Sequence, residues 1–449
     1  MTESYNSREI VLEMLLEVLE GGKFSHTIQN QTLKRYQMLE KQERAFLSRV
    51  FTGTVKVYLT LDYIIEQFST LPVRKMKPMI RNLLRMSVYQ LRYMDQVPSS
   101  AVCNEAVKLA KKRGFDKLSG FVNGILRNIT RNEANIKFPD KQLDPIKYLE
   151  ISYSYPQWLV SELLTQYDFA TVETILAASL TEKELTIRTN LQKITPQELN
   201  MILLAEGVTV EESDYLSYAF KIKNYDYLEK LEAFQKGYFT VQDVSSMLVG
   251  EVAGICEKDL VVDVCAAPGG KTMHAAQTAN SVLARDLTEY KVGLINENLK
   301  RLDLTNVQTK VWDASVLDEE LVGKTDVVIA DLPCSGMGVF GKKADLKYKF
   351  LPNQQKELVE LQRKILSVIQ SYVKEGGVLM FSTCTINHGE NTDNMEWFLD
   401  NFDFTLENLD AFLPDKLKSE TTAKGYLQLL QGVHSTDGFF IAKFRRKRS

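Results

Sequence analysis

The sequence contains few cysteines, and they lie far apart. Their number is odd, they form no CxxC pair, and they stand at Cys103, Cys256, Cys265, Cys334 and Cys384. Neither a disulfide framework nor a zinc site is indicated, so we expect no bound metal. Free thiols in a chain of this size are typical of a reducing compartment, which predicts a cytoplasmic protein.

Long hydrophobic runs are also missing. No segment reaches the roughly 20 apolar residues that a membrane-spanning helix needs. The first ten residues, MTESYNSREI, lack the basic start and apolar stretch of a secretory signal. We therefore expect a globular chain with no membrane partner. Its 449 residues exceed the roughly 250–300 that one core usually holds, which predicts more than one domain.

The net charge of −3 conceals an uneven distribution. Residues 1–140 carry 22 Lys and Arg against 14 Asp and Glu, and residues 71–131 carry 13 basic against 3 acidic residues. A basic region on a mildly acidic chain suggests that one module docks on a polyanion. A solvated helix surface would give the same composition, so both interpretations stay open at this point.

Hydrophobic periodicity divides the chain into three parts. Apolar residues recur at helical spacing through residues 1–140, with short connections, which predicts an all-α domain. A proline-containing stretch, residues 132–156, is interpreted as a linker, and it leads into the middle part of the chain, residues 141–239. Two helical segments, a strand at 185–189 and another helix follow. This middle part is predicted to be a small α+β subdomain.

Residues 240–449 alternate between strand and helix patterns. Strands are predicted at 260–265, 281–286, 307–313, 326–331 and 377–383, and helices at 271–278, 288–302 and 354–374. Strands buried on both faces and separated by helices predict a doubly wound, Rossmann-like parallel sheet. Residues 425–431 and 439–444 are predicted to be a closing pair of strands. The last basic residues, 445–448, are predicted to be a disordered tail.

The loop after the first of these strands predicts a ligand site. Ligands bind at the carboxyl ends of strands in such sheets, and Gly269 and Gly270 let the backbone turn tightly beside a ligand. The loop lacks GxGxxG spacing, which argues against a dinucleotide. Acids end the next three strands at Asp286, Asp313 and Asp331, where they could receive ribose hydroxyls and an adenine amine. The alternative for each acid is a helix N-cap.

Two cysteines follow the fourth and fifth strands of this sheet. Cys334 stands in DLPCSG and Cys384 in STCT, so both fall at the edge that carries the predicted nucleoside site. Cysteine is most often a small buried hydrophobe. That interpretation suits Cys103 and Cys256, which lie in apolar helical patterns, but not the two polar-flanked thiols.

Methylation at C5 of cytosine would explain a pair of thiols. C5 is not nucleophilic in the intact ring, but a thiolate that adds to C6 makes it enamine-like. A base must then remove the C5 proton so that the thiol is expelled. Protonating or hydrogen-bonding N3 of the ring favours the addition, and Asp331 is placed for that. A free thiol with a pKa of about 8.5 is mostly protonated at neutral pH, so the nucleophile needs activation. The residues alone do not decide which cysteine attacks.

At these residues the chain resembles a known family. The signature motifs of the RNA cytosine-5 methyltransferases of the NOL1/NOP2/Sun type are similar to DVCAAPGGKT (263–272), DLPCSGMG (331–338) and STCT (382–385). Supporting fragments are SYPQWL (154–159), IRTN (187–190), VQDVSS (241–246) and DGFFIAKF (437–444). FVNGILRNI (121–129) resembles the end of a NusB-like RNA-binding domain. That domain is carried by the RsmB (Sun/Fmu) branch, the bacterial 16S rRNA cytosine-5 methyltransferases.

The resemblance implies a fold, a reaction and residue roles. It implies a NusB-like N-terminal domain, a class I methyltransferase C-terminal domain, S-adenosylmethionine as cofactor and 16S rRNA as substrate. Cys384 matches the family's C6 nucleophile, and Cys334 matches the cysteine that assists product release. The cofactor contacts of the family match Cys265, Ala266, Ala267, Pro268, Gly269, Gly270, Lys271, Asp286, Asp313 and Asp331. We also expect a monomer.

One segment departs from the family pattern, and two other functions stay open. After DLPCSGMG the family usually has a Pro and then a Trp where this chain has Ala344 and Tyr348, which puts the loop geometry in question. The same motifs would serve a cytosine-5 methyltransferase acting on tRNA or another rRNA site. A non-catalytic RNA-binding factor in ribosome assembly is compatible with the basic helical domain.

Overall fold

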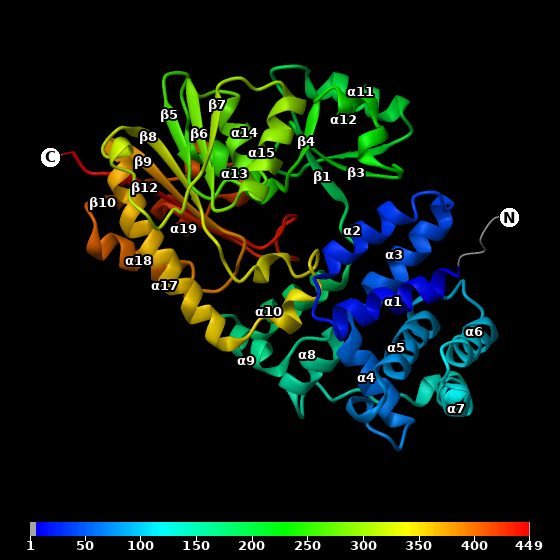
Figure 1. The fold of residues 1–449 in the computed structure, drawn as a ribbon. Coiled ribbons are helices and arrows are strands. Elements are labelled where there is room, and N and C mark those ends of the chain that lie inside the picture. The colour runs from blue at the N-terminus through cyan, green and yellow to red at the C-terminus, as the bar shows by residue number, and fades with distance from the viewer. Residues whose placement is uncertain (1–5, 449) are drawn as a thin grey trace. The chain divides into compact units, whose positions relative to one another are not determined.

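The computed structural model describes residues 6–448, which form two compact units (Figure 1). The first unit contains the described residues up to Thr181 together with Phe340–Phe350. The second contains Glu182–Val339 and the described residues from Leu351 onward. A segment from late in the chain therefore belongs to the N-terminal unit.

The first unit is helical, as predicted. Its helices are α1 (Ser7–Leu19), α2 (Ser25–Arg35), α3 (Lys41–Lys56), α4 (Tyr58–Gln67), α5 (Pro78–Tyr93), α6 (Ser99–Lys112), α7 (Asp116–Arg131), α8 (Pro145–Tyr153), α9 (Gln157–Gln166), α10 (Phe169–Leu180) and α16 (Leu346–Lys349). The side chain of Asn6 caps α1 by accepting from the N–H groups of Arg8 and Glu9. Helix α5 supplies much of the core, because every residue from Asn82 to Gln90 is buried, so that this part of the helix is covered on all sides.

The predicted linker is partly wrong. Residues 132–156 contain α8, which starts with Pro145 in its first turn, where a missing N–H costs nothing. Asp144 caps this helix by accepting from the N–H of Lys147. Pro145, which we interpreted as a linker residue, thus marks a helix start. Helices α8, α9 and α10 belong to the helical unit; the finer boundaries at 140 and 239 stay predictions.

The second unit begins with a small antiparallel sheet of order β2-β3-β1-β4. Its elements are β1 (Leu185–Thr189), α11 (Pro196–Ala205), β2 (Thr209–Glu212), β3 (Ala219–Lys223), α12 (Glu232–Gln235) and β4 (Phe239–Val241). Helix α11 starts with a capping box between Thr195 and Glu198. This is the α+β subdomain that the sequence predicts.

The rest of the second unit is a sheet of order β10-β12-β9-β8-β5-β6-β7, with β11 paired to β12. Its strands are β5 (Leu260–Asp263), β6 (Ser281–Asp286), β7 (Val307–Val311), β8 (Thr325–Asp331), β9 (Val373–Thr383), β10 (Phe404–Leu406), β11 (Tyr426–Leu429) and β12 (Phe439–Arg446). The five predicted strands are present and parallel, whereas β10, β11 and β12 pair antiparallel. The sheet is therefore mixed.

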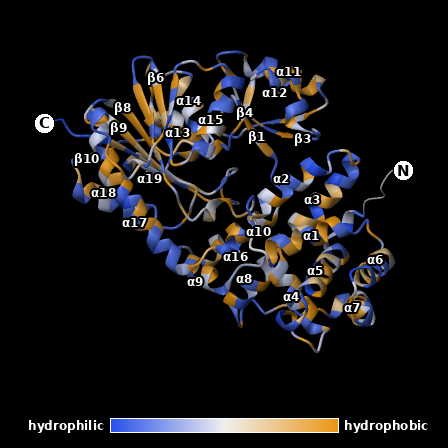
Figure 2. Ribbon diagram, viewed as in Figure 1, coloured by the Kyte–Doolittle hydropathy of each residue, from blue (hydrophilic) through white to orange (hydrophobic). Residues whose placement is uncertain are grey.

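Helices cover both faces of this sheet. They are α13 (Val244–Ala253), α14 (Gly270–Ala276), α15 (Glu289–Leu302), α17 (Pro352–Ile369), α18 (Thr392–Asn401) and α19 (Glu420–Lys424). Successive residues of β5 enter opposite layers: Val261 packs with α13, α14 and α15, and Val262 packs with α17 and α18. Figure 2 shows hydrophobic colour along β6 and β8, in contrast to the largely hydrophilic α17. This burial on both faces explains the continuous apolar runs in the sequence.

The predicted disordered tail is wrong. Arg445 and Arg446 are the last residues of β12. Arg445 donates to Glu407 and to the carbonyl of Gly376, and Arg446 donates to the carbonyl of Val373. The basic composition predicts a solvated end, but the end of β12 pairs with β9 and β10, and this pairing orders Arg445 and Arg446. Short 3-10 turns complete the fold at Val73–Lys75, Glu133–Asn135, Leu228–Lys230, Glu319–Leu321, Met337–Val339, Gln370–Tyr372, Asp410–Phe412 and Asp415–Leu417.

Candidate active site

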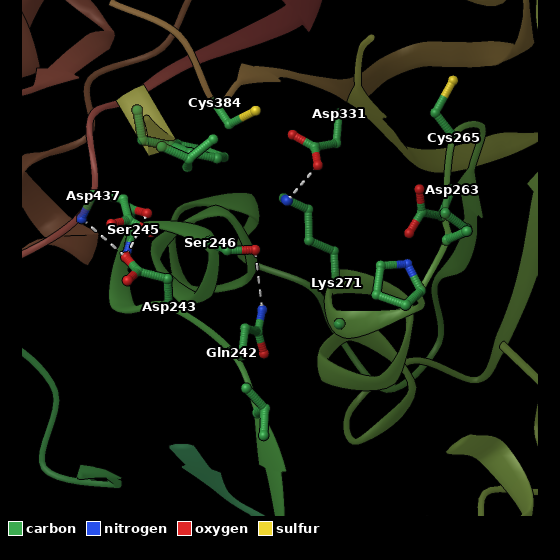
Figure 3. Close-up of a pocket in the computed structure, with 17 residues that line it drawn as sticks. Gln242, Asp243, Ser245, Ser246, Asp263, Cys265, Lys271, Asp331, Cys384 and Asp437 are labelled. Carbon is green, nitrogen blue, oxygen red and sulfur yellow. Dashed lines mark hydrogen bonds and ion pairs between the residues drawn. The ribbon is translucent and has the colours of Figure 1, made fainter. Parts of the chain in front are cut away.

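A pocket of about 240 Å³ opens at the carboxyl edge of the large sheet. Strand β5 lies between β6 and β8, so the chain order reverses there, which is where doubly wound sheets bind ligands. The pocket is lined by Val241, Gln242, Asp243, Ser245, Ser246, Asp263, Cys265, Ala266, Ala267, Pro268, Gly270, Lys271, Asp331, Val339, Cys384, Asp437 and Phe439. The structure therefore brings most of the predicted site residues together (Figure 3).

The loop between β5 and α14 forms one wall of this pocket. Gly269 has a φ of +105°, a conformation that side chains rarely adopt, which explains the glycine at this position. Gly270 differs, because a Cβ there would lie in ordinary contact with Gln242, 3.5 Å away. The N–H of Ala267 donates to Asp286 over 2.9 Å, so the acid at the end of β6 fixes the loop.

Asp331 and Lys271 form an ion pair inside the pocket. Lys271 Nζ lies 2.6 Å from Asp331 Oδ2, and Ser382 Oγ donates to Asp331 Oδ1 over 2.8 Å. Ser382 stands opposite Asp331 in the register of β8 and β9. Figure 3 shows this pair between the Asp263 side of the pocket and the Asp243 side. Two neighbours thus fix the direction of the Asp331 carboxylate.

The other two predicted acids do not line the pocket. Asp286 is buried and also accepts from the N–H of Leu287 and pairs with Lys291. Asp313 lies two residues past β7 and accepts from the N–H of Ser315, which lowers its pKa. Both acids stand beside neighbouring strand ends, but their roles in binding a nucleoside remain predictions.

The two cysteines meet where β8 and β9 end. Cys334 Sγ and Cys384 Sγ lie 3.1 Å apart, and both side chains are half-buried. Cys384 lines the pocket, whereas Cys334 is not among the lining residues. The hydrogen bond to Cys384, burial, and the charges of Glu390 and Asp331 raise the pKa of Cys334 well above its ordinary value. Either thiol of this pair can donate to the other.

Comparisons with known proteins agree with this arrangement. Residues 254–445 match the family model of 16S rRNA methyltransferase RsmB/F, residues 5–131 match the NusB family, and residues 155–229 match the RsmF/B-like ferredoxin-like domain. The Bacillus subtilis (strain 168) protein named "Probable ribosomal RNA small subunit methyltransferase B" is 36% identical over 446 residues, 98% of each chain. This chain belongs to the ribosomal RNA small subunit methyltransferase B family.

Other relatives extend over the same length. A protein of the same name from Synechocystis sp. (strain ATCC 27184 / PCC 6803 / Kazusa) is 31% identical, covering 98% of this chain and 99% of that one. The crystal structure of PH0851 is similar in fold, with a TM-score of 0.81, 24% identity and 99% coverage of both chains. The predicted architecture of a NusB-like domain, a small middle domain and a Rossmann-like methyltransferase domain is thereby confirmed.

Sequence reasoning missed Asp263, the last residue of β5. Its side chain is 1% exposed; Oδ2 accepts from Thr272 Oγ1 over 2.6 Å, while Oδ1 has no hydrogen-bond partner among residues 6–448. Burial raises the pKa of Asp263 to about 7. The available signal was a charged residue at the end of the apolar run LVVD.

The wall opposite the loop was also missed. It consists of the residues before and at the start of α13 together with Asp437. Gln242 is oriented by the fully buried Arg188, whose Nε donates to Gln242 Oε1 over 2.8 Å. Lys183 pairs with Asp437 at 2.8 Å. The fragments VQDVSS and DGFFIAKF contain these residues, so their likeness to the family was the signal.

The departure from the family pattern lies in the helical unit. Ala344 is 3% exposed and packs in the core of that unit. The centroid of the Tyr348 ring lies 4.2 Å from that of Tyr58, with the two rings tilted by 51°, and the Tyr348 hydroxyl donates to the carbonyl of Lys56. The two family-unlike residues thus belong to a packed helical core, and neither lines the pocket.

The structure contains neither a membrane helix nor a metal cluster in the part of the chain that it describes. No helix within residues 6–448 has both the length and the hydropathy needed to cross a bilayer. Over the same residues, His, Cys, Asp and Glu form no group of three or more that could hold a metal ion.

Proposed function

We propose that this protein methylates C5 of a specific cytosine in 16S rRNA, using S-adenosylmethionine and a covalent bond between Cys384 and C6. The observation that carries the proposal is the pair of thiols 3.1 Å apart, of which Cys384 lines the same pocket as Asp331. Membership of the small subunit methyltransferase B family supports methyl transfer to this RNA. Such a substrate would place the protein in the cytoplasm.

The pocket residues fit S-adenosylmethionine. The Gly269 turn brings loop backbone beside the pocket, and Asp263 presents a buried oxygen without a partner, which suits an ammonium donor. We propose that the loop from Cys265 to Lys271 and Asp263 hold the methionine part, and that Asp286 and Asp313 hold the nucleoside. When bound, this cofactor supplies an electrophilic methyl group on a sulfonium.

The chain's own residues would handle the cytosine. Cys384 forms a bond to C6, which moves electron density towards C5 and N3. A proton held between ring N3 and the Asp331 carboxylate neutralises the charge at N3, while Lys271 holds that carboxylate in place. The base must leave its stack to reach these groups. Once Cys384 is bonded to C6, its charge no longer raises the pKa of Cys334. Cys334 can then lose its own proton to solvent, and its thiolate accepts the C5 proton as the bond from Cys384 to C6 breaks and Cys384 leaves as a thiolate.

Single cysteine variants test the assignment of roles. Cys334→Ala should accumulate a covalent adduct with RNA, because addition occurs but release fails. Cys384→Ala should form no adduct, since it lacks the nucleophile. Denaturing gels of each variant with 16S rRNA and labelled S-adenosylmethionine would measure this. Adducts in both variants, or in neither, would contradict the roles.

Bisulfite sequencing of total RNA tests the substrate. A deletion strain should lose one 5-methylcytosine from 16S rRNA, and re-expression of the wild-type protein, but not of Cys384→Ala, should restore it. A lost signal in tRNA or 23S rRNA would instead favour the alternative substrates. If calorimetry detects no binding of S-adenosylmethionine, the non-catalytic assembly role is favoured.

A further inference from the structure

A fully buried arginine of the small sheet bonds to the wall of the pocket. Arg188 lies on β1, opposite Thr240 of β4, and its side chain is 1% exposed. Its Nε donates to Gln242 Oε1 over 2.8 Å, and its Nη1 donates to Gln277 Oε1 over 2.7 Å. Burial lowers the pKa of Arg188 to about 10, so the guanidinium stays charged at neutral pH. Buried charges are usually paired, whereas this one is held by two neutral amides, which calls for an explanation.

The guanidinium fixes the direction of both amides. It has donors but no acceptor, so an amide that faces it must present its oxygen. A second constraint holds Gln277 from the other side. Asn190 Nδ2 donates to the carbonyl of Gly237 over 3.0 Å, which leaves Asn190 Oδ1 to accept from Gln277 Nε2 over 2.9 Å. Gln277 therefore links Arg188 to the backbone, and the Gln242 amide is held with its nitrogen turned away from Arg188.

The nitrogen end of the Gln242 amide is a donor in the pocket wall. Gln242 Nε2 donates to Ser246 Oγ over 3.4 Å, a long hydrogen bond, and this is its one acceptor within residues 6–448. Figure 3 shows the amide nitrogen directed at Ser246 and the oxygen turned away from it. An amide nitrogen carries two hydrogens, so at least one of them is left for a ligand.

The pocket offers few other side-chain donors to an anion. Among the described residues that line it, Gln242 and Lys271 alone carry a side-chain nitrogen. Lys271 Nζ is already paired with Asp331 at 2.6 Å. Carboxylates are more frequent in the lining, and they belong to Asp243, Asp263, Asp331 and Asp437. A ligand carboxylate would be repelled by these acids, so it needs a donor whose position is fixed, and Gln242 supplies one.

Gln242 and Asp263 lie beside the same turn of α14. A Cβ on Gly270 would lie 3.5 Å from Gln242 Cδ, and Thr272 Oγ1 donates to Asp263 Oδ2 over 2.6 Å. The head group of an amino acid carries its ammonium and its carboxylate on one carbon, so the partners of the two groups must be neighbours. The unpartnered oxygen of Asp263 suits the ammonium, and the Gln242 N–H suits the carboxylate.

We infer that Arg188 is a positioning residue that turns the Gln242 amide so that its N–H donates to the carboxylate of S-adenosylmethionine. The inference rests on the proposed function, which puts this cofactor in the pocket. It gives the small sheet a part in cofactor recognition, although no residue of β1 lines the pocket. It also explains why a charged side chain is buried against two amides.

Calorimetry with two ligands tests the inference without RNA. The probes are S-adenosylmethionine and decarboxylated S-adenosylmethionine, which lacks the carboxylate but keeps the ammonium and the sulfonium. The wild type should prefer the first. Gln242→Glu gives Arg188 a carboxylate partner, so the melting temperature should not fall, but it replaces the N–H by a negative charge. It should weaken binding of S-adenosylmethionine about tenfold to a hundredfold and change binding of the decarboxylated ligand less than about twofold.

Variants of Arg188 test the positioning role. Arg188→Leu frees the Gln242 amide to rotate, which should reduce the preference for S-adenosylmethionine about threefold to tenfold. Arg188→Lys, which keeps a donor for Gln242 Oε1, should retain part of it. In a Gln242→Leu protein, the further change Arg188→Leu should leave the preference unaltered, because the two residues act as one unit. Arg363→Leu is the matched control: Arg363 Nε also donates to a side-chain amide, that of Asn394, over 2.8 Å, and its loss should not change the preference.

The results separate this inference from the proposed function. If Gln242→Glu weakens both ligands in parallel, or leaves the preference unchanged, the inference is overturned, even where Arg188→Leu fails to fold. A wild type that binds both ligands equally would also overturn it and leave the proposed function standing. A wild type that binds neither ligand would contradict the proposed function, and the inference with it.

Discussion

Asp263 shows how one side chain can lower stability in a site built for a ligand. It ends a buried strand, and one of its oxygens has no partner among the described residues. Burial raises its pKa from 3.8 to about 7, so folding disfavours the ionised form. A hydrophobic strand end without this charge would fold more readily. Because this carboxylate lowers the stability of the fold, we explain its presence at the pocket by ligand binding.

The stability effect of Asp263 should depend on pH. Well below pH 3.8 the carboxyl group is protonated in both states, so its ionisation does not lower stability. As pH rises from about 4 to 7, the unfolded chain ionises it while the folded chain keeps the proton, so the wild type loses stability. Asp263→Asn should thus raise the free energy of unfolding at pH 8 by about 1–3 kcal/mol, and by much less at pH 4.5.

Urea unfolding of both proteins at the two pH values would measure this difference. Asp400→Asn, at an exposed position on α18, serves as the control and should change little. Because the free Asp263 oxygen lines the pocket, the Asn variant should also bind S-adenosylmethionine more weakly in calorimetry. An Asp263→Asn protein that is less stable than the wild type at pH 8 would contradict the pKa argument.

The elements of the large sheet were predictable because their burial leaves a plain pattern. Apolar runs such as LVVDVC are long, and helical segments separate them, so the five parallel strands were found. The short strands β2, β3 and β4 were not, since three to five residues are too few to show a clear strand pattern. Charge misled the prediction at Arg445 and Arg446, where strand pairing outweighs the preference of arginine for solvent.

The site was predictable as motifs but not as contacts. Sequence order placed both cysteines at one sheet edge, yet their separation depends on backbone that no pattern specifies. Gly338 is an example: its N–H donates to the carbonyl of Cys384, and its carbonyl accepts from Gly438. A Cβ at Gly338 would lie 1.9 Å from the Gly438 carbonyl oxygen, so only glycine fits between these loops. The sequence contains this glycine, but it does not reveal that Cys384 and Gly438 contact it.

At the scale of the whole molecule, the chain passes from one unit to the other and back within Phe340–Phe350. This segment follows directly after the Cys334 loop, yet it completes the core of the helical unit. Lys347 is 1% exposed and donates to the carbonyl of Lys56 over 2.9 Å. The helical unit is therefore not formed by consecutive residues alone, which explains why the departures at Ala344 and Tyr348 are packing residues.

Asp345 gives a test of this shared construction in the full-length chain. Its carboxylate accepts from the N–H of Ser25 at the start of α2 over 3.0 Å and pairs with Lys349 at 2.7 Å. Asp345→Ala leaves the first turn of α2 without this acceptor, at a cost of roughly 1–3 kcal/mol. Amide exchange in α2 should therefore accelerate about tenfold to a hundredfold, while β5 and β8 keep their protection.

Asp116→Ala, which removes an exposed acid from the first turn of α7, is the matched control and should leave amide exchange in α2 unchanged. Equal exchange of α2 in all three proteins would contradict the stabilisation of α2 by residues 340–350. Acceleration confined to α2 in Asp345→Ala would show that a segment following the Cys334 loop stabilises an N-terminal helix.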